Sequence, residues 1–348
     1  MSPELQNYYS TNYSNCNLSH NWLATWQGVA YPSHAIQIIA SPIQIFTFYI
    51  IWAKTPRTMK NMKLPLLVNH FWCTWFDLML CTLSTPDVFL PTTVFSGVGI
   101  LSSLEIPFTP QLATGQFSAL FLCSSYVYLF ESRSSALPQN RFRMTRKVSR
   151  ICYHSLLLSI NLAILISMNY FSTAEESEKL EALKIYPCPT KEFFEFPVTI
   201  FIPDPEFRQF FLKFLFPGFG IHSFGNLGFH VACTVYYLFL ASPKTTIASG
   251  TRQAQRTFFI GIIFQTAIPV FPGACSWLLV LVFTENYRQE LMNLTVIFFG
   301  LNGLAESLLI LSIHHPFRIA VKQLFGFGKY RGLQQNTRPH HEIPTIFW

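Results

Sequence analysis

Seven apolar stretches, each about as long as a membrane-spanning helix, constrain this chain more than any other feature. A helix needs about 20 mostly apolar residues to cross the hydrocarbon core of a bilayer. The seven stretches cover residues 35–53, 64–84, 111–130, 151–171, 217–241, 258–283 and 293–313. The sequence therefore predicts an all-α membrane protein, in which residues 1–348 form a single seven-transmembrane-helix bundle.

The charge content supports a membrane protein and argues against a nucleic-acid partner. Only 12% of the residues carry a full charge, and half are hydrophobic. Soluble domains average about 25% charged residues, so this chain has too few to cover a globular surface in water. The net charge of +7 comes from short basic clusters between the apolar stretches. Such clusters indicate one side of a membrane better than a nucleic-acid-binding face.

The basic residues predict the orientation of the chain in the membrane. Eighteen of the 24 lysines and arginines follow the first, third, fifth and seventh stretches, and cytosolic loops are the ones enriched in these residues. We therefore expect the amino-terminal segment 1–34 and the long loop 172–213 outside the cell, and the tail 314–348 in the cytosol. Two glycosylation sequons in the amino-terminal segment agree, with Asn12 and Asn17 as candidate sites.

Two segments between the stretches carry further signals. Residues 92–104 are apolar but little over half a span long, so we expect a short interfacial helix there. In the long loop, residues 173–176 form a capping box that predicts a short helix through Lys184. Prolines at 187, 189, 197, 203 and 205 then exclude further regular helix. Cys16 and Cys188 both face the oxidising side, so they are candidates for a disulfide, or else two unpaired thiols.

Charged residues inside a span are costly and usually face the interior of the bundle. Asp77 in the second stretch and Glu306 in the seventh are the two clear cases. His70 shares a helical face with Asp77, and Asn302 lies one turn before Glu306. We expect a polar core of these four residues. It would rearrange on activation or hold an ion, or else act as fixed hydrogen-bonded glue between helices.

The third and sixth stretches carry features that a moving bundle would need. Glu131 and Arg133 lie at the cytosolic end of the third stretch, where they can pair with different helices and lock the bundle. The alternative is an ordinary basic cap that extends to the interface. Pro269 and Pro272 in the sixth stretch predict a kink, and we interpret it as a hinge.

The fifth stretch carries His222, Asn226 and His230 on one stripe, but it does not predict a metal site. Eight helical residues separate the histidines by about 12 Å, too far for one ion. Cavity lining or hydrogen bonds between helices fit better. We expect a ligand pocket toward the outer side, with His222, Asn226 and Tyr287 as candidates. The sequence has no catalytic motif, so we expect no enzyme and no cofactor.

Several short motifs, in order along most of the chain, resemble the class H serpentine chemoreceptors of nematodes. The most specific covers residues 54–63, followed by 66–72 with Asp77. Weaker matches lie at residues 41–42, 130–133, 265–269 and 315–318. Ser132 stands where the family often has Asn. The resemblance implies a G-protein-coupled, GPCR-like seven-helix receptor in the plasma membrane of sensory neurons or their cilia. Such a receptor would sense a small chemical cue and couple to a heterotrimeric G protein around Arg133.

Three other functions remain open at this stage. A small secondary transporter would be expected to show internal repeats, and none is visible between the halves. A membrane enzyme would need converging reactive groups, for which only Asp77 and Glu306 are candidates. An odour-gated channel subunit is compatible with the composition, but such a protein would often have its amino terminus inside the cell.

Overall fold

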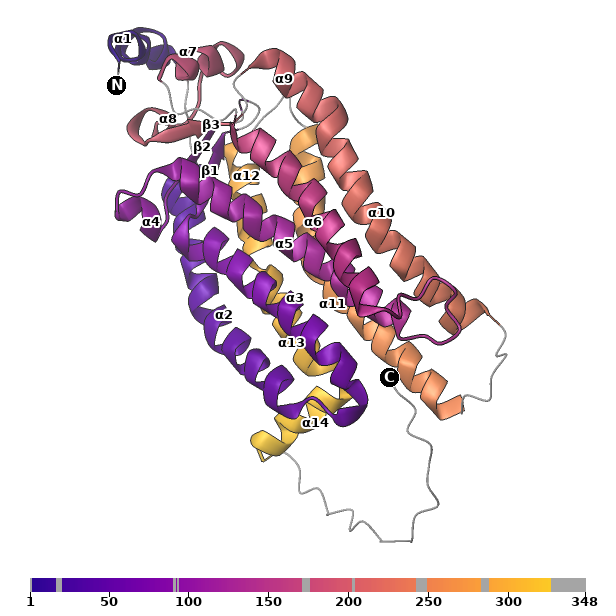
Figure 1. The fold of residues 1–348 in the computed structure, drawn as a ribbon. Coiled ribbons are helices and arrows are strands. Elements are labelled where there is room, and N and C mark those ends of the chain that lie inside the picture. The colour runs from indigo at the N-terminus through magenta and orange to yellow at the C-terminus, as the bar shows by residue number, and fades with distance from the viewer. Residues whose placement is uncertain are drawn as a thin grey trace, which may run out of the picture.

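The structure is a computed structural model, and it describes residues 2–16, 21–89, 92, 94–170, 176–201, 204–241, 249–282 and 288–326. Long helices lie side by side in a bundle, and short helices with three strands cover one end of it (Figure 1). We call this the sheet end. We call the opposite end, where α2 ends at Lys54 and α3 begins at Lys60, the basic end.

The first four predicted spans lie in four long helices. They are α2 (Trp26–Lys54), α3 (Lys60–Leu78) continued by the π-helical turn η4 (Met79–Leu83), α5 (Phe108–Ser135) and α6 (Lys147–Tyr170). The helix α2 begins well before the apolar stretch because Thr25 caps it, accepting a hydrogen bond from the backbone nitrogen of Gly28.

The fifth span is longer than the apolar stretch predicts. It runs through α9 (Pro205–Phe210), η5 (Phe211–Leu215), α10 (Phe216–Val235) and η6 (Tyr236–Leu240). The expectation that no regular helix follows Lys184 until the apolar stretch is wrong here. Pro205 occupies the first turn, where a missing backbone N–H costs nothing, and Asp204 caps the helix by accepting from the nitrogens of Glu206 and Phe207.

The last two predicted spans lie in α11 (Ser249–Val282) and in the pair α12 (Gln289–Gly300) and α13 (Asn302–Ile313), which are interrupted at Leu301. A further helix that the sequence analysis missed, α14 (His315–Leu324), follows at the basic end. Its Phe317 and Ala320 are buried against the bundle, in a cluster with Ile51 and Phe259. Helix α14 could have been recognised from its apolar residues at helical spacing.

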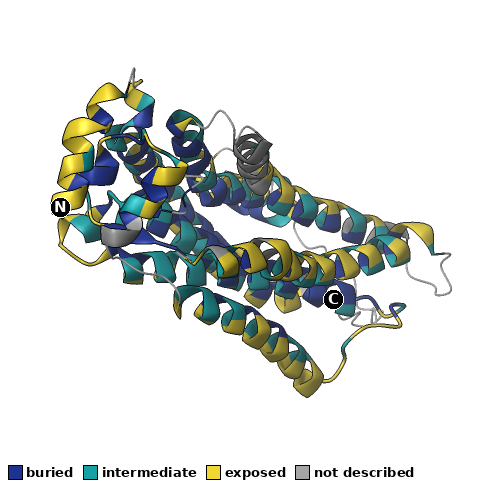
Figure 2. Cartoon of the chain, turned by 90° about the horizontal axis from the view of Figure 1, so that it is seen from above, coloured by how far each residue is buried: buried dark blue, intermediate teal, exposed yellow. Residues whose placement is uncertain are grey.

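The surface of the bundle is consistent with a surrounding bilayer. Within the described ranges, four helices are long and apolar enough to cross a membrane: Trp26–Lys54, Lys60–Leu83, Lys147–Tyr170 and Gln289–Ile313. Large apolar side chains are exposed along the helices, such as Ile38 and Ile45 of α2 and Leu156 of α6. Exposed positions lie on the outward faces, while buried ones face the interior (Figure 2). An apolar surface of this extent is unfavourable in water and favourable in lipid.

A three-stranded antiparallel sheet forms part of the sheet end. Its strands are β1 (Pro86–Phe89), β2 (Val94–Gly97) and β3 (Val198–Ile200), in that order, with Val94 opposite both Phe89 and Ile200. The interfacial helix expected over residues 92–104 is therefore wrong in its first half, where β2 pairs with strands on both sides. Among the described residues of this segment, only α4 (Ile100–Ser103), one turn long, is helical.

Short helices and a disulfide complete the sheet end. They are α1 (Pro3–Thr11), η1 (Tyr13–Asn15), η2 (Trp22–Ala24), α7 (Glu176–Ile185) and α8 (Glu192–Glu195). The helix expected through Lys184 is α7. A disulfide joins Cys16 to Cys188, and the Tyr13 hydroxyl donates to the backbone oxygen of Pro189. These contacts hold the amino-terminal segment against the long loop over a common apolar cluster that includes Leu5 and Phe194.

Candidate functional site

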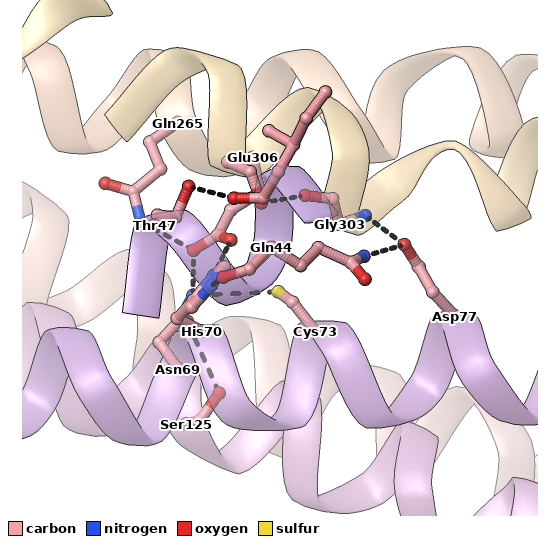
Figure 3. A network of polar contacts seen from close by, with 12 residues as sticks. Gln44, Thr47, Asn69, His70, Cys73, Asp77, Ser125, Gln265, Gly303 and Glu306 are labelled. Atoms are coloured by element: carbon pink, nitrogen blue, oxygen red, sulfur yellow. Dashed lines mark hydrogen bonds and ion pairs between the residues drawn. The ribbon is translucent and has the colours of Figure 1, made fainter. Parts of the chain in front are cut away.

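A buried network of polar side chains crosses the middle of the bundle (Figure 3). It joins α2, α3, α5, α11 and α13. Its centre is Glu306, a fully buried carboxyl on α13. One carboxyl oxygen accepts hydrogen bonds from the side-chain amides of Asn69 (3.1 Å) and Gln265 (3.0 Å), and the other lies 2.6 Å from Nδ1 of His70. Three helices therefore meet at this one carboxyl group.

The His70–Glu306 pair carries no net charge, wherever its shared proton lies. Nε2 of His70 is 3.0 Å from the backbone oxygen of Gln44, which can only accept, so Nε2 must carry a hydrogen. The remaining proton sits between Nδ1 and the carboxyl group. The pair is then either imidazolium with carboxylate or two neutral groups, and both forms avoid an uncompensated charge in the membrane interior.

Asp77 forms the second half of the network, nearer the sheet end. Its Oδ2 accepts from the side-chain amide of Gln44 (3.0 Å) and from the backbone nitrogen of Gly303 (2.8 Å). Its Oδ1 is buried and has no hydrogen-bond partner among the residues that the structure describes. Gln44 thus connects the two acids, because its side chain binds Asp77 while its backbone oxygen binds His70.

The structure brings together three of the four residues expected in the polar core, His70, Asp77 and Glu306. The fourth, Asn302, is buried one turn before Glu306, beside this network. Sequence reasoning missed Gln44 and Asn69, which supply amide groups to the acids. Both are strongly polar residues within apolar stretches, a position that favours a buried hydrogen-bonding role and could have identified them. Within the described ranges, no cluster of three His, Cys, Asp or Glu side chains is placed to hold a metal ion.

At the basic end, Arg133 binds α11. Its side chain is only 2% exposed, and its Nη2 donates to the backbone oxygen of Gln255 at 3.0 Å. The guanidinium also lies 5.5 Å from the ring centroid of Phe258, also in α11. A snorkelling basic cap would extend into the interface, whereas this arginine is buried between two helices.

Glu131 binds a different helix from Arg133. Its Oε2 accepts from Nη2 of Arg150 on α6 at 2.6 Å and lies 3.3 Å from Nε2 of His154. Its Oε1 accepts from the hydroxyl of Ser135 at 2.7 Å. The acid and the arginine at the end of α5 therefore connect to α6 and α11 respectively, in the divided arrangement that the sequence analysis described.

The polar stripe of α10 bonds to neighbouring helices. His230 lies 2.9 Å from the hydroxyl of Ser134 on α5 and 3.1 Å from the hydroxyl of Tyr153 on α6. Tyr153 also donates to the side-chain oxygen of Asn226 at 2.8 Å. Nε2 of His222 is buried, with no partner in the described part of the chain. Tyr287, the third residue expected at the pocket, lies outside the described residues, as does Asn17.

The remaining predicted residues are Asn12, Pro269 and Pro272. Asn12 is exposed at the end of α1. Helix α11 continues through both prolines without an interruption. Their use as a hinge stays a prediction.

Comparison with known proteins identifies the family. The model of the family described as "Serpentine type 7TM GPCR chemoreceptor Srh" matches residues 24–327. The chain belongs to this family. It is also 30% identical over 327 residues to Serpentine receptor class H-72 of Caenorhabditis elegans, with 92% of each chain covered. The crystal structure of squid rhodopsin has the same fold, with a TM-score of 0.52 and 12% identity over 89% of this chain and 88% of that one.

Membership of the Srh family confirms the fold class and the resemblance stated from the sequence. The protein is a multi-pass membrane receptor of the seven-transmembrane, GPCR-like type. The family is a class of receptors, so chemistry on a substrate is not its role. The groups described above therefore have to be explained as parts of a receptor. In this structure they are contacts that hold the helices of the bundle together.

Proposed function

We propose that this Srh receptor binds a small chemical cue on the extracellular side and activates a heterotrimeric G protein in the cytosol. In this proposal the sheet end faces outward and the basic end faces the cytosol, in the plasma membrane, with the cilia of sensory neurons as one location. Family membership supports the class of function. The observation that carries the mechanism is the buried contact between Arg133 and the backbone of α11.

At the basic end, Arg133 and Glu131 of α5 hold α11 and α6 in place, and we call these contacts the lock. While Arg133 binds the Gln255 carbonyl, the basic end of α11 stays close to α5. If α11 swings away, this buried guanidinium loses the Gln255 carbonyl as its hydrogen-bond acceptor and becomes available to a partner. The glutamate–arginine contact between Glu131 and Arg150 holds the start of α6 in the same way. Release would open a basic surface that suits an acidic region of a G protein.

The buried network supplies the second set of contacts that such a movement would break. Gln265 of α11 donates to Glu306, and its side-chain oxygen lies 3.1 Å from Nε2 of His314, at the junction of α13 and α14. A rotation of α11 that carries the Gln265 side chain away from α13 breaks both contacts, because one amide group makes both. We propose that the network is a switch between two arrangements of α11 and not fixed glue alone.

The proposal is tested with Arg133→Ala in cells that express the receptor and a G-protein-dependent reporter. A screen of volatile and soluble cues first identifies a stimulus for the wild type. We expect the variant to lose the cue-evoked signal by a factor of about ten or more, because it lacks the guanidinium that α11 would release to the G protein. A hydrogen bond of a charged group is worth roughly 1.5–3 kcal/mol. Surface expression is measured in the same cells.

The matched control is Arg141→Ala, which removes an exposed arginine from the same end of the bundle. It should leave both signal and surface expression unchanged. An unchanged response in Arg133→Ala at normal surface expression would refute the proposed role of Arg133. A response that appears as a direct current and does not depend on a G protein would favour a channel.

A further inference from the structure

A cavity of about 240 Å³ lies between α5, α6 and the segment from η5 to α10. Its walls are almost entirely apolar, with Leu120, Ile164, Leu165, Phe211 and Phe219 among the lining residues. It lies toward the sheet end, since Phe211 opens η5 and Met168, near the end of α6, belongs to the same lining. In the proposed orientation this is the outer half of the membrane.

Asn161 is the exception among the apolar walls. It lies on α6, lines the cavity and is only 1% exposed. Neither its side-chain oxygen nor its side-chain nitrogen has a hydrogen-bond partner among the described residues. The other amide of the lining, Gln116, is already engaged, because its oxygen accepts from Asn169 at 2.7 Å. A buried amide without partners is costly, so native structures rarely leave one unsatisfied without a functional reason.

The volume and the lining of the cavity restrict the size and the polarity of a ligand that could fill it. An engineered apolar cavity of about 150 Å³ accepts benzene, so this one has room for a molecule of roughly ten non-hydrogen atoms. The lining residues include no charged side chain, which excludes an ion on grounds of desolvation. The side-chain amide of Asn161 offers a donor nitrogen and an acceptor oxygen at the same place. The complementary group therefore both donates and accepts, as a primary amide or an alcohol does.

We propose that this cavity binds the chemical cue, and that the cue is a small neutral molecule with an apolar body and one amide or hydroxyl group that pairs with Asn161. This inference rests on the proposed function and specifies its ligand site. It differs from the pocket expected around His222 and Asn226, because Asn226 is engaged by Tyr153.

The position of the cavity connects it to the lock at the basic end. Cys123 lines the cavity from α5, and Glu131 lies eight residues further along the same helix, about 12 Å away. Likewise, α6 carries Asn161 in the cavity wall and Arg150 in the ion pair with Glu131. A ligand that moves α6 relative to α5 therefore acts on the helices that hold the lock.

Cys123 provides a direct readout of occupancy, because alkylation of a cavity thiol is slowed by any molecule that fills the cavity. The receptor is purified with the three other free cysteines that are not buried replaced by alanine, namely Cys152, Cys233 and Cys275. It is placed in phospholipid nanodiscs. Alkylation of Cys123 by N-ethylmaleimide is timed with hexanamide, 1-heptanol or heptane present at matched concentrations in the bilayer. The same series is run on Asn161→Leu, which keeps the volume close but removes both polar atoms.

We expect hexanamide and 1-heptanol to slow the alkylation of Cys123 more than heptane does. In Asn161→Leu this preference should fall about tenfold, since the paired polar group is gone. Equal protection by all three probes would overturn the proposal, and so would a preference that survives in Asn161→Leu. Absence of alkylation in the probe-free receptor would also overturn it, because the cavity would be closed to small molecules. Alkylation in detergent but not in nanodiscs would indicate a phospholipid chain as the occupant instead.

The binding test is independent of G-protein coupling. Arg133→Ala should retain the preference for hexanamide over heptane, because Arg133 lies at the other end of α5. If the wild-type receptor prefers hexanamide over heptane but gives no G-protein-dependent signal, the result counts against the proposed function and leaves the ligand site intact. Normal cue-evoked signalling in Asn161→Leu, with an unchanged dose dependence, would count against this site alone.

Discussion

Asp87 illustrates how one buried carboxyl can make the stability of the sheet end depend on pH. The residue lies in β1, outside the spanning helices, and is fully buried. Its Oδ1 accepts from the amide of Gln289 at 2.9 Å, while Oδ2 has no partner within the described part of the chain. Burial, with a smaller contribution from nearby Glu192, raises the pKa of Asp87 from 3.8 to about 8. The folded receptor therefore holds this proton near neutral pH.

We expect the folded receptor to lose stability as the pH rises from about 4 to about 8, with Asp87 as one cause. Over this range the unfolded chain has already released the proton that the folded chain keeps, so the free energy of unfolding falls and then levels off. Asp87→Asn removes this dependence. Its melting temperature at pH 8.5 should exceed that of the wild type by about 4 °C or more, with a clearly smaller difference at pH 5 and none near pH 3.

Thermal unfolding in detergent, followed across the pH range, measures this effect. The matched control is Glu105→Gln, which neutralises an exposed carboxyl at the same end. Parallel curves for the wild type and Asp87→Asn would contradict the assignment.

At the scale of elements, the approach of α13 to α3 depends on the absence of a side chain at Gly303. A Cβ atom at this position would lie 2.5 Å from Oδ2 of Asp77 and 2.8 Å from Nε2 of Gln44. The backbone nitrogen of Gly303 donates a hydrogen bond to Oδ2 of Asp77, so a small shift of α13 also weakens that bond. One glycine thus permits α2, α3 and α13 to share the buried acid.

Gly303→Ala should destabilise the receptor by about 1–3 kcal/mol, the usual cost of overpacking a tight core. The matched control is Gly115→Ala on α5, where a Cβ would meet nothing within 4 Å. This change should be neutral or stabilising, by roughly 0.5–1 kcal/mol, because alanine favours helix. Thermal unfolding of both variants in detergent tests the contrast. Equal effects would show that general helix propensity, and not the contact with Asp77, decides the outcome.

At the scale of the whole molecule, the two ends of the bundle differ in construction. The sheet end is closed by the disulfide between Cys16 and Cys188 and by the sheet that joins β1, β2 and β3. Disulfides persist on the oxidising side of a membrane. The basic end carries the lysines and arginines that cytosolic loops retain. Both features favour the same orientation, although they arise from unrelated chemistry.

The orientation predicts two results in intact cells. Asn12→Gln should remove a glycan and lower the apparent mass of the receptor, because Asn12 is exposed at the sheet end. An epitope placed after Trp348 should bind antibody only once the cells are permeabilised. Staining of the epitope on intact cells would reverse the orientation and remove the basis for coupling at Arg133.

The helices of the bundle follow from local sequence, and the sheet does not. Among the described residues, each apolar stretch is helical along nearly its whole length, with a break at Leu301 in the seventh, since a helix satisfies its own backbone within the segment. Residues 92–104 show the limit of this reasoning. The strand Val94–Gly97 pairs with the nearby Pro86–Phe89 on one side and, on the other, with Val198–Ile200, about a hundred residues away. No periodicity within residues 92–104 could reveal that pairing.

The sequence by itself determined that this chain spans a membrane and where its spans lie. It also determined that Asp77 and Glu306 are buried. Hydration energies act on each residue separately, so these conclusions need no knowledge of the contacts. Tertiary structure alone decided which groups meet. The contact of Glu306 with His70, the approach of Gly303 to Asp77 and the unpaired amide of Asn161 depend on how the helices rotate and cross. Hydrogen bonds form only within about 3 Å, so such partners exist only once the helices are packed.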